Sequence, residues 1–248
     1  MRVNDYLSVL MCQLNITLDC NHKDEYLIET ECTTNQMLKA LYVIKNKQPD
    51  VTLFPEISYN KRLDETYKKF SKNDKIIVAG SYYKNGINYT VVFQNGKKYE
   101  IPKGYASGAE PMARRISYIN PEKFLETELR KHEFKVKGKK IYIFNCMEYY
   151  NLAYYIARNP KYKENLFGIF TICSNSNTHV FEEETTVIHN HNDIVGVGRL
   201  RAEHPLTGHD VHLAALFLQI NADFGAGFAA ADDHDLMGQF GLMTVNIH

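Results

Sequence analysis

The stretch KKIYIFNCMEYYN, residues 139–151, carries the pattern on which the fold prediction rests. The apolar run before Cys146 predicts a buried strand, and residues 149–158 predict a helix that ends before Pro160. Cys146 therefore lies where a strand gives way to a turn and a helix. A thiolate is a strong nucleophile, although a neighbouring base must remove its proton at about pH 7. We predict that Cys146 is a nucleophile, with a small buried core residue as the alternative.

The segment DVTLFPEIS, residues 50–58, places Glu56 directly after another apolar run. A carboxylate at the end of a buried strand is costly unless it is paired or used. Desolvation also raises the pKa of a carboxyl group toward the range of a general base. We therefore predict that Glu56 is a general base. A solvated loop carboxylate is the alternative.

The segment EIPKGYASGAEP, residues 100–111, places Lys103 at the end of a third predicted strand. An ammonium group there would stabilise a developing oxyanion, together with the backbone N–H of Met147, which follows Cys146. Because lysines are abundant in this half of the chain, a solvated surface lysine is the alternative.

The order glutamate, lysine, cysteine, each at a strand end, resembles the site of the nitrilase, or carbon–nitrogen hydrolase, superfamily. The resemblance implies that Glu56 takes the thiol proton, protonates the leaving amine and then activates water. It implies that Lys103 stabilises the oxyanion. It also implies substrate-binding roles for Glu110, which matches the family's second glutamate, and for Met147 and Glu148.

Apolar and amphipathic runs predict a mixed α/β fold, because helices separate most of the buried strands. The pattern alone supports the α/β class. The resemblance implies the four-layer α-β-β-α sandwich of the nitrilase type, in which two sheets face each other with helices outside. We predict strands at 6–16, 51–56, 76–83, 88–96, 97–103, 132–146 (a hairpin around residue 138), 166–174 and 193–197, and helices at 33–47, 62–72, 149–158 and 181–191.

Composition limits the class of protein. The chain has 248 residues, 44% of them hydrophobic, which is enough for one large domain or two small ones. Five cysteines without a C-x-x-C pair argue against a disulfide framework or a zinc ribbon, and reduced thiols suit a cytosolic enzyme. No apolar run reaches about 18 residues and no signal-peptide pattern is present. We expect a soluble, cytoplasmic protein with no membrane partner and, since residues 131–140 alternate like a solvated hairpin, no nucleic-acid partner.

The composition changes near Gly198. All 21 lysines precede this point, whereas the last 51 residues hold two arginines and six acidic residues. We predict a carbon–nitrogen hydrolase-like domain at 1–197 and a compositionally distinct segment at 198–248, which completes the fold or mediates assembly. Apart from Asn221, the usual family ending has no counterpart, so we expect this segment to be displaced or poorly packed. Its apolar run VHLAALFLQI, residues 211–220, should be buried as one strand or helix.

Seven of the ten histidines fall between His189 and His248, with aspartates nearby. These residue types suit divalent metals, but no framed spacing such as H-E-x-x-H occurs. We therefore predict no metal site and no cofactor.

We predict a cysteine-dependent hydrolase of a non-peptide carbon–nitrogen bond, an amidase or nitrilase that acts on a small-molecule amide or nitrile through a thioester. Superfamily members commonly self-associate, so the resemblance also implies a homo-oligomer. The alternative from another class is a non-catalytic nitrilase-fold module for binding or assembly. A third, weaker hypothesis is a metal-dependent hydrolase built on the C-terminal histidines.

Overall fold

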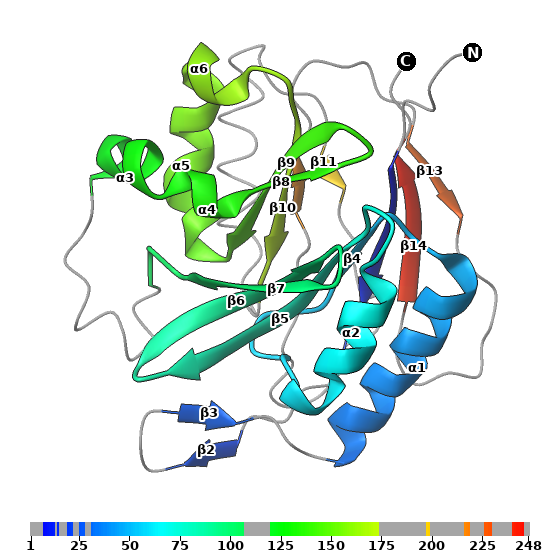
Figure 1. Ribbon diagram of the computed structural model, residues 1–248. Coiled ribbons are helices and arrows are strands. Elements are labelled where there is room, and N and C mark those ends of the chain that lie inside the picture. The colour runs from blue at the N-terminus through cyan, green and yellow to red at the C-terminus, as the bar shows by residue number, and fades with distance from the viewer. Residues whose placement is uncertain are drawn as a thin grey trace.

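The chain folds into two larger β-sheets, a two-stranded ribbon and the helices that cover the sheets (Figure 1). The predicted mixed α/β class is confirmed. The computed structural model describes residues 7–12, 14, 19–21, 25–27, 31–106, 120–173, 197–198, 216–218, 226–229 and 240–245.

The first sheet has seven strands, which in spatial order are β13 (Ala226–Ala229), β14 (Phe240–Val245), β1 (Leu7–Cys12), β4 (Val51–Leu53), β5 (Ile76–Lys84), β6 (Ile87–Gln94) and β7 (Lys97–Pro102). Strands β1, β4 and β5 run parallel, and β6 and β7 follow β5 as antiparallel hairpins. The parallel strands are almost wholly buried, which explains their unbroken apolar runs. Asn95 and Gly96 have φ angles of 51° and 75°, the geometry of the predicted two-residue turn.

The second sheet has five strands, which in spatial order are β11 (Val197–Gly198), β12 (Leu216–Leu218), β10 (Leu166–Ile172), β9 (Lys139–Asn145) and β8 (Glu133–Val136). Strands β8 and β9 form the predicted hairpin, and β9 runs parallel to β10. The strands predicted within 132–146 and 166–174 are therefore confirmed. The separate ribbon pairs β2 (Asp19–Asn21) with β3 (Glu25–Leu27).

The helices are α1 (Glu31–Lys47), the 3-10 turn η1 (Lys61–Leu63), α2 (Asp64–Phe70), α3 (Pro121–Thr127), α4 (Leu129–His132), α5 (Met147–Arg158) and α6 (Pro160–Lys163). The predictions at 33–47, 62–72 and 149–158 are confirmed, although α5 begins directly after Cys146. Helices α3 and α4 were not predicted. The signal for α3 was present, since Asn120 caps it and a proline takes its first position. None of the helices in the described ranges combines the length and the hydropathy needed to span a membrane.

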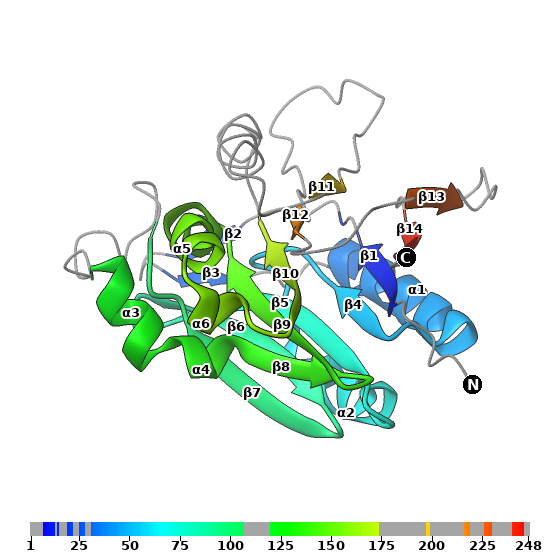
Figure 2. The same cartoon turned by 90° about the horizontal axis from the view of Figure 1, so that it is seen from above.

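Three apolar clusters define how the layers pack. One lies between the two sheets and joins Val9, Leu53 and Val78 of the first sheet to Ile143 and Phe170 of the second. A second cluster packs the other face of the first sheet against α1 and α2, and a third packs the second sheet against α3 to α6. Figures 1 and 2 show the two groups of helices on opposite sides of the paired sheets.

Strands from the C-terminal segment join both sheets. Strand β14 pairs with the whole of β1, from Leu7↔Val245 to Cys12↔Phe240, and β12 pairs with β10. The described parts of residues 198–248 therefore join both sheets, which agrees with the predicted alternative in which this segment completes the fold. Without these partners, β1 and β10 would present unpaired backbone groups along apolar strands, and pairing satisfies them whatever the local composition. Within the run 211–220, predicted as one strand or helix, the described residues Leu216–Leu218 form strand β12.

Parts of the sequence predictions lie outside the described residues. Among these are Glu110, Asn221, the helix predicted at 181–191 and, apart from Val197, the strand predicted at 193–197.

We predict that Ile143→Ala destabilises the protein by about 2–5 kcal/mol, because it leaves a cavity between the sheets. Ile143 is 1% exposed, whereas Tyr42 on α1 is 67% exposed and provides a matched control. Tyr42→Ala should change the unfolding free energy by less than about 0.5 kcal/mol. Urea denaturation measures both. Equal losses in the two variants would contradict the packing of the sheets described above.

Candidate active site

The three predicted catalytic side chains all follow the carboxyl ends of strands. Glu56 lies three residues after β4, Lys103 directly after β7, and Cys146 directly after β9. Strand β7 runs in the direction of β4, because β4 is parallel to β5 and two antiparallel steps lead from β5 to β7. The carboxyl ends of strands form the edge where α/β proteins commonly bind ligands. The topology therefore brings Glu56 and Lys103 to one edge of the first sheet.

Glu56 and Lys103 form a buried ion pair. The Lys103 Nζ atom lies 2.7 Å from Glu56 Oε1, and the two residues are only 2% and 3% exposed. Asn88 Nδ2 donates to the same carboxylate oxygen at 2.9 Å, and the Lys103 backbone N–H donates to Asn88 O at 2.8 Å. Such support is what a buried ion pair needs to offset its desolvation. Both alternatives, a solvated carboxylate and a solvated lysine, are wrong.

Cys146 lies on a strained turn between β9 and α5. Its φ of 49° and ψ of −106° are unusual for a residue with a side chain. Its backbone N–H donates to Ile172 O of β10 at 2.8 Å, and its carbonyl accepts from Tyr149 N of α5 at 3.0 Å. Strand β10 and helix α5 therefore both hold the residue in place. Strain of this kind persists where the surroundings impose it and is common at functional sites. A strand-to-helix turn with a strained nucleophile is a known catalytic arrangement.

Met147 begins α5, so its backbone N–H lies in the first turn and has no carbonyl partner within the helix. Its side chain is half-buried against the cluster that packs α5 on the second sheet. The predicted substrate contact of Met147 stays a prediction. Glu110 lies outside the described residues.

Glu148 links the segments that carry the lysine and the cysteine. Its Oε1 accepts from Gly104 N at 2.7 Å and its Oε2 from Asn145 N at 2.8 Å. The side chain is buried, and His132 Nδ1 lies 3.9 Å from Oε2. The carboxylate therefore binds the residue after Lys103 and the residue before the turn at Cys146. The structure gives Glu148 a positioning geometry, while its predicted contact with substrate stays a prediction.

Cys173 is a site residue that sequence reasoning missed. Cys173 and Cys12 are both 0% exposed. Burial raises the pKa of the Cys173 thiol, and a hydrogen bond with the Cys146 thiol raises it further. The charge of Glu56 raises this pKa as well, whereas Lys103 lowers it. The pKa of this one buried thiol therefore responds to all three predicted catalytic groups.

The signal for Cys173 was its place at the end of the run LFGIFTI, beside the strand that ends at Cys146. Two polar residues of β6 were missed as well. Asn88 binds the carboxylate of Glu56, and Thr90 Oγ1 accepts from Asn145 Nδ2 at 3.0 Å, which ties β9 to the first sheet. Nothing in the hairpin sequence distinguishes these side chains from other strand residues.

The segment that carries Glu56 lies tightly against β5 at Gly80. A Cβ atom on this glycine would lie 2.2 Å from Ser58 Oγ and 2.6 Å from the Pro55 carbonyl oxygen, and its φ is +94°. Ser81 fixes the same segment, since its hydroxyl and its carbonyl oxygen both accept backbone N–H groups from it. The position of the Glu56 backbone therefore depends on the absence of a side chain at residue 80.

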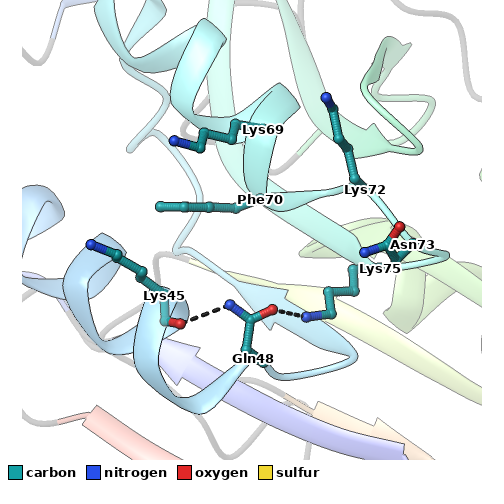
Figure 3. A pocket seen from close by; sticks show the side chains of 7 residues that line it. All are labelled: Lys45, Gln48, Lys69, Phe70, Lys72, Asn73 and Lys75. Atoms are coloured by element: carbon teal, nitrogen blue, oxygen red, sulfur yellow. Dashed lines mark hydrogen bonds between the residues drawn. The ribbon is translucent and has the colours of Figure 1, made fainter.

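The hollow drawn in Figure 3 lies at the opposite end of the parallel strands. It has a volume of about 380 Å³ and is lined by four lysines together with Gln48, Phe70 and Asn73. Gln48 precedes β4, and Lys75, one of the four lysines, precedes β5. A second hollow of about 560 Å³ lies among α3, α5 and α6. Neither contains Glu56, Lys103 or Cys146, and we place the candidate site by its buried charges.

No protein-family model matches the chain, and no curated protein matches it significantly. Within the described part of the chain, no three histidine, cysteine or carboxylate side chains gather into a metal-binding group. The histidines from His189 onward lie outside that part. The functional proposal therefore depends on the residues around Cys146 and on their geometry.

We predict that Glu148→Gln lowers the unfolding free energy by about 1–3 kcal/mol, because an amide N–H₂ would then face a buried backbone N–H. Glu65→Gln is the matched control, since the Glu65 side chain is 86% exposed. The control should change stability by less than about 0.5 kcal/mol. Denaturant unfolding of both variants measures the difference. A loss no larger than that of the control would show that the two backbone contacts do not stabilise the fold.

We predict that Gly80→Ala costs more than about 1 kcal/mol of stability, because the new methyl group meets Ser58 and Pro55 as well as an unfavourable φ. Gly138→Ala is a matched control, since Gly138 also has a positive φ, of 76°, but a Cβ there meets nothing within 4 Å. The difference between the losses of unfolding free energy in the two variants measures the cost of the steric clash at residue 80. Equal costs would contradict the close approach of the Glu56 segment to β5.

Proposed function

We propose that the chain is a cysteine-dependent hydrolase of a non-peptide carbon–nitrogen bond, with Glu56, Lys103 and Cys146 as its catalytic residues. The observation that carries the proposal is a buried ion pair, Lys103 with Glu56 at 2.7 Å, whose segment Glu148 links to the strained strand-to-helix turn at Cys146. A buried ion pair is a poor way to gain stability, since apolar side chains often do as well. Buried charges whose segment is tied to that of a strained cysteine are better explained by chemistry.

The first step forms the covalent bond. The Glu56 carboxylate takes the proton of the Cys146 thiol, and the sulfur attacks the carbon of the amide or nitrile. For an amide, the C=O π electrons move to oxygen and form a tetrahedral oxyanion. The Lys103 ammonium and the Met147 backbone N–H supply positive charge and a hydrogen-bond donor for this oxygen.

The second step breaks the carbon–nitrogen bond. The oxyanion collapses, the nitrogen leaves with the proton held by Glu56, and the acyl group remains on Cys146 as a thioester. Glu56, again a carboxylate, then removes a proton from water, which attacks the thioester carbon. The acid leaves and the thiol regains its proton. With a nitrile, attack of the sulfur gives a thioimidate. Water adds to this intermediate and ammonia leaves, so the same thioester forms and is hydrolysed as for an amide.

Glu148 and Asn88 act as positioning residues in this scheme. Glu148 holds Gly104 and Asn145, the neighbours of the lysine and the cysteine, through two backbone N–H groups. Asn88 donates to the carboxylate oxygen that also binds Lys103. Polar groups held in place in this way need little rearrangement as charge develops in the transition state.

The nitrilase-type four-layer α-β-β-α sandwich is part of the proposal. It is supported by an apolar cluster between the two sheets and by helices packed on both outer faces. A homo-oligomer follows from the same resemblance. A cytoplasmic location is also proposed, because a thiol nucleophile requires a reducing compartment and the described cysteines Cys12, Cys146 and Cys173 are free thiols.

We predict that Cys146→Ala abolishes ammonia release from any small amide or nitrile that the wild-type protein hydrolyses. Glu56→Gln should lower kcat by about 10²- to 10⁴-fold, the usual worth of a general acid–base. Cys12→Ala and Glu65→Gln are controls outside the site and should retain turnover. Assays on a panel of aliphatic and aromatic amides and nitriles measure all four, with far-UV circular dichroism to check folding. Near-normal turnover in the Cys146 or Glu56 variant would sink the mechanism.

A further inference from the structure

Cys146 and Cys173 end two neighbouring parallel strands. Strands β9 and β10 pair in the register Phe144↔Thr171 and Asn145↔Ile172, so the next residue on each strand is a cysteine. The Cys146 N–H donates to Ile172 O at 2.8 Å, which extends the contact to this last position. Neighbouring strands lie about 4.8 Å apart. This is within the Cα separation of about 4.4–6.8 Å that a disulfide spans.

The two thiols also meet through their side chains. Both belong to the apolar cluster between the second sheet and α5, and they are 4% and 0% exposed. The thiols of Cys173 and Cys146 are hydrogen-bonded to each other. Both are free cysteines. Cys12, also a buried free thiol, lies in a different cluster, between the first sheet and α1.

We propose that Cys146 and Cys173 form a redox modification site, in which Cys173 captures an oxidised Cys146 as a reversible disulfide that switches the nucleophile off. The inference rests on the proposed function, because it takes Cys146 to be the reactive thiol. The pairing adds a role for Cys173 that hydrolysis does not require.

The oxidant is a peroxide, and hydrogen peroxide is the simplest member of that class. The Cys146 thiolate attacks one peroxide oxygen, the O–O bond breaks, and hydroxide leaves to be protonated as water. Cys146 is then a sulfenic acid, oxidised by two electrons. The Cys173 sulfur attacks the Cys146 sulfur, the S–O bond breaks, and the hydroxyl leaves as water with the Cys173 proton. One peroxide and two thiols give one disulfide and two waters.

The surroundings assign the two roles. Cys146 is 4% exposed and Cys173 0%, and Glu148 ties the turn at Cys146 to the segment that carries Lys103. The thiol on the side of the ion pair is the one expected to react first. Cys173 is fully buried, and its burial raises the pKa of its thiol. It therefore stays protonated and slow toward peroxide until the sulfenic acid forms beside it. This matches the usual arrangement of an oxidised cysteine with a resolving cysteine.

Peroxide treatment followed by reduction tests the proposal. We expect wild-type protein to lose turnover and to yield a peptide pair linked through Cys146 and Cys173 in non-reducing mass spectrometry. Dithiothreitol should restore at least half of the turnover. In Cys173→Ser, Cys146 should go on to sulfinic acid, a gain of two oxygen atoms that dithiothreitol does not reverse. Cys12→Ser should behave as the wild type. Absence of the linked pair, or equal recovery in Cys173→Ser, would overturn the proposal.

Phenylarsine oxide provides a second readout that does not depend on oxidation or on turnover. A trivalent arsenical binds two adjacent thiols and releases one water. We expect a single dithiol adduct, mapped to Cys146 and Cys173, in the wild type and in Cys12→Ser. It should be lost in Cys173→Ser, and an adduct that persists there at these positions would contradict the pairing.

The two proposals can fail separately. A linked pair in a protein that hydrolyses nothing in the amide and nitrile panel would count against the hydrolase and not against the pairing. Turnover that depends on Cys146, without any linked pair, would overturn the redox site and leave the hydrolase in place.

Discussion

The buried ion pair between Glu56 and Lys103 is the constraint on which the rest of the site depends. Neither charge can stay out of water alone, so the ends of β4 and β7 must hold them together at 2.7 Å. Asn88 adds a donor to the same oxygen, and Gly80 lets the Glu56 segment lie close against β5. The contacts that the first sheet provides therefore offset the cost of removing these two charges from water. A charged pair in this position is best explained by use on a third group, and we propose that this group is the sulfur of Cys146.

The cysteine that follows strand β9 of the second sheet has a strained backbone. A left-handed backbone at a residue with a side chain costs about 1–3 kcal/mol, and it persists because β10 holds the Cys146 N–H and α5 begins at the next residue. Glu148 then fixes the distance between the sheets by binding one backbone N–H from each side. Packing between the sheets and this carboxylate together determine where the thiol lies relative to the ion pair. Stability and function are therefore coupled at Glu148.

Sequence reasoning predicted the strands that carry the site, because parallel buried strands need unbroken apolar runs and hairpins need turn residues such as Asn95-Gly96. It also pointed to Glu56, Lys103 and Cys146, since a reactive side chain directly after such a run is rare. It missed Cys173, which ends an apolar run but owes its importance to the neighbouring strand, and it missed Asn88, which no local pattern marks. It left open whether residues 198–248 complete the fold, because composition says nothing about which edge strands need partners. Long-range pairing is set by the whole sheet, and one segment does not encode it.

The most direct test of the central claim, that Glu56 activates Cys146, is the rate at which each cysteine reacts with iodoacetamide, followed by peptide mass spectrometry. The thiolate is the form that reacts, so an adjacent base should raise the rate selectively. We expect Cys146 to be labelled much faster than Cys12 and the other cysteines, and Glu56→Gln to remove most of that advantage. Labelling of Cys146 no faster than that of Cys12, or a fast rate that Glu56→Gln leaves unchanged, would contradict the account.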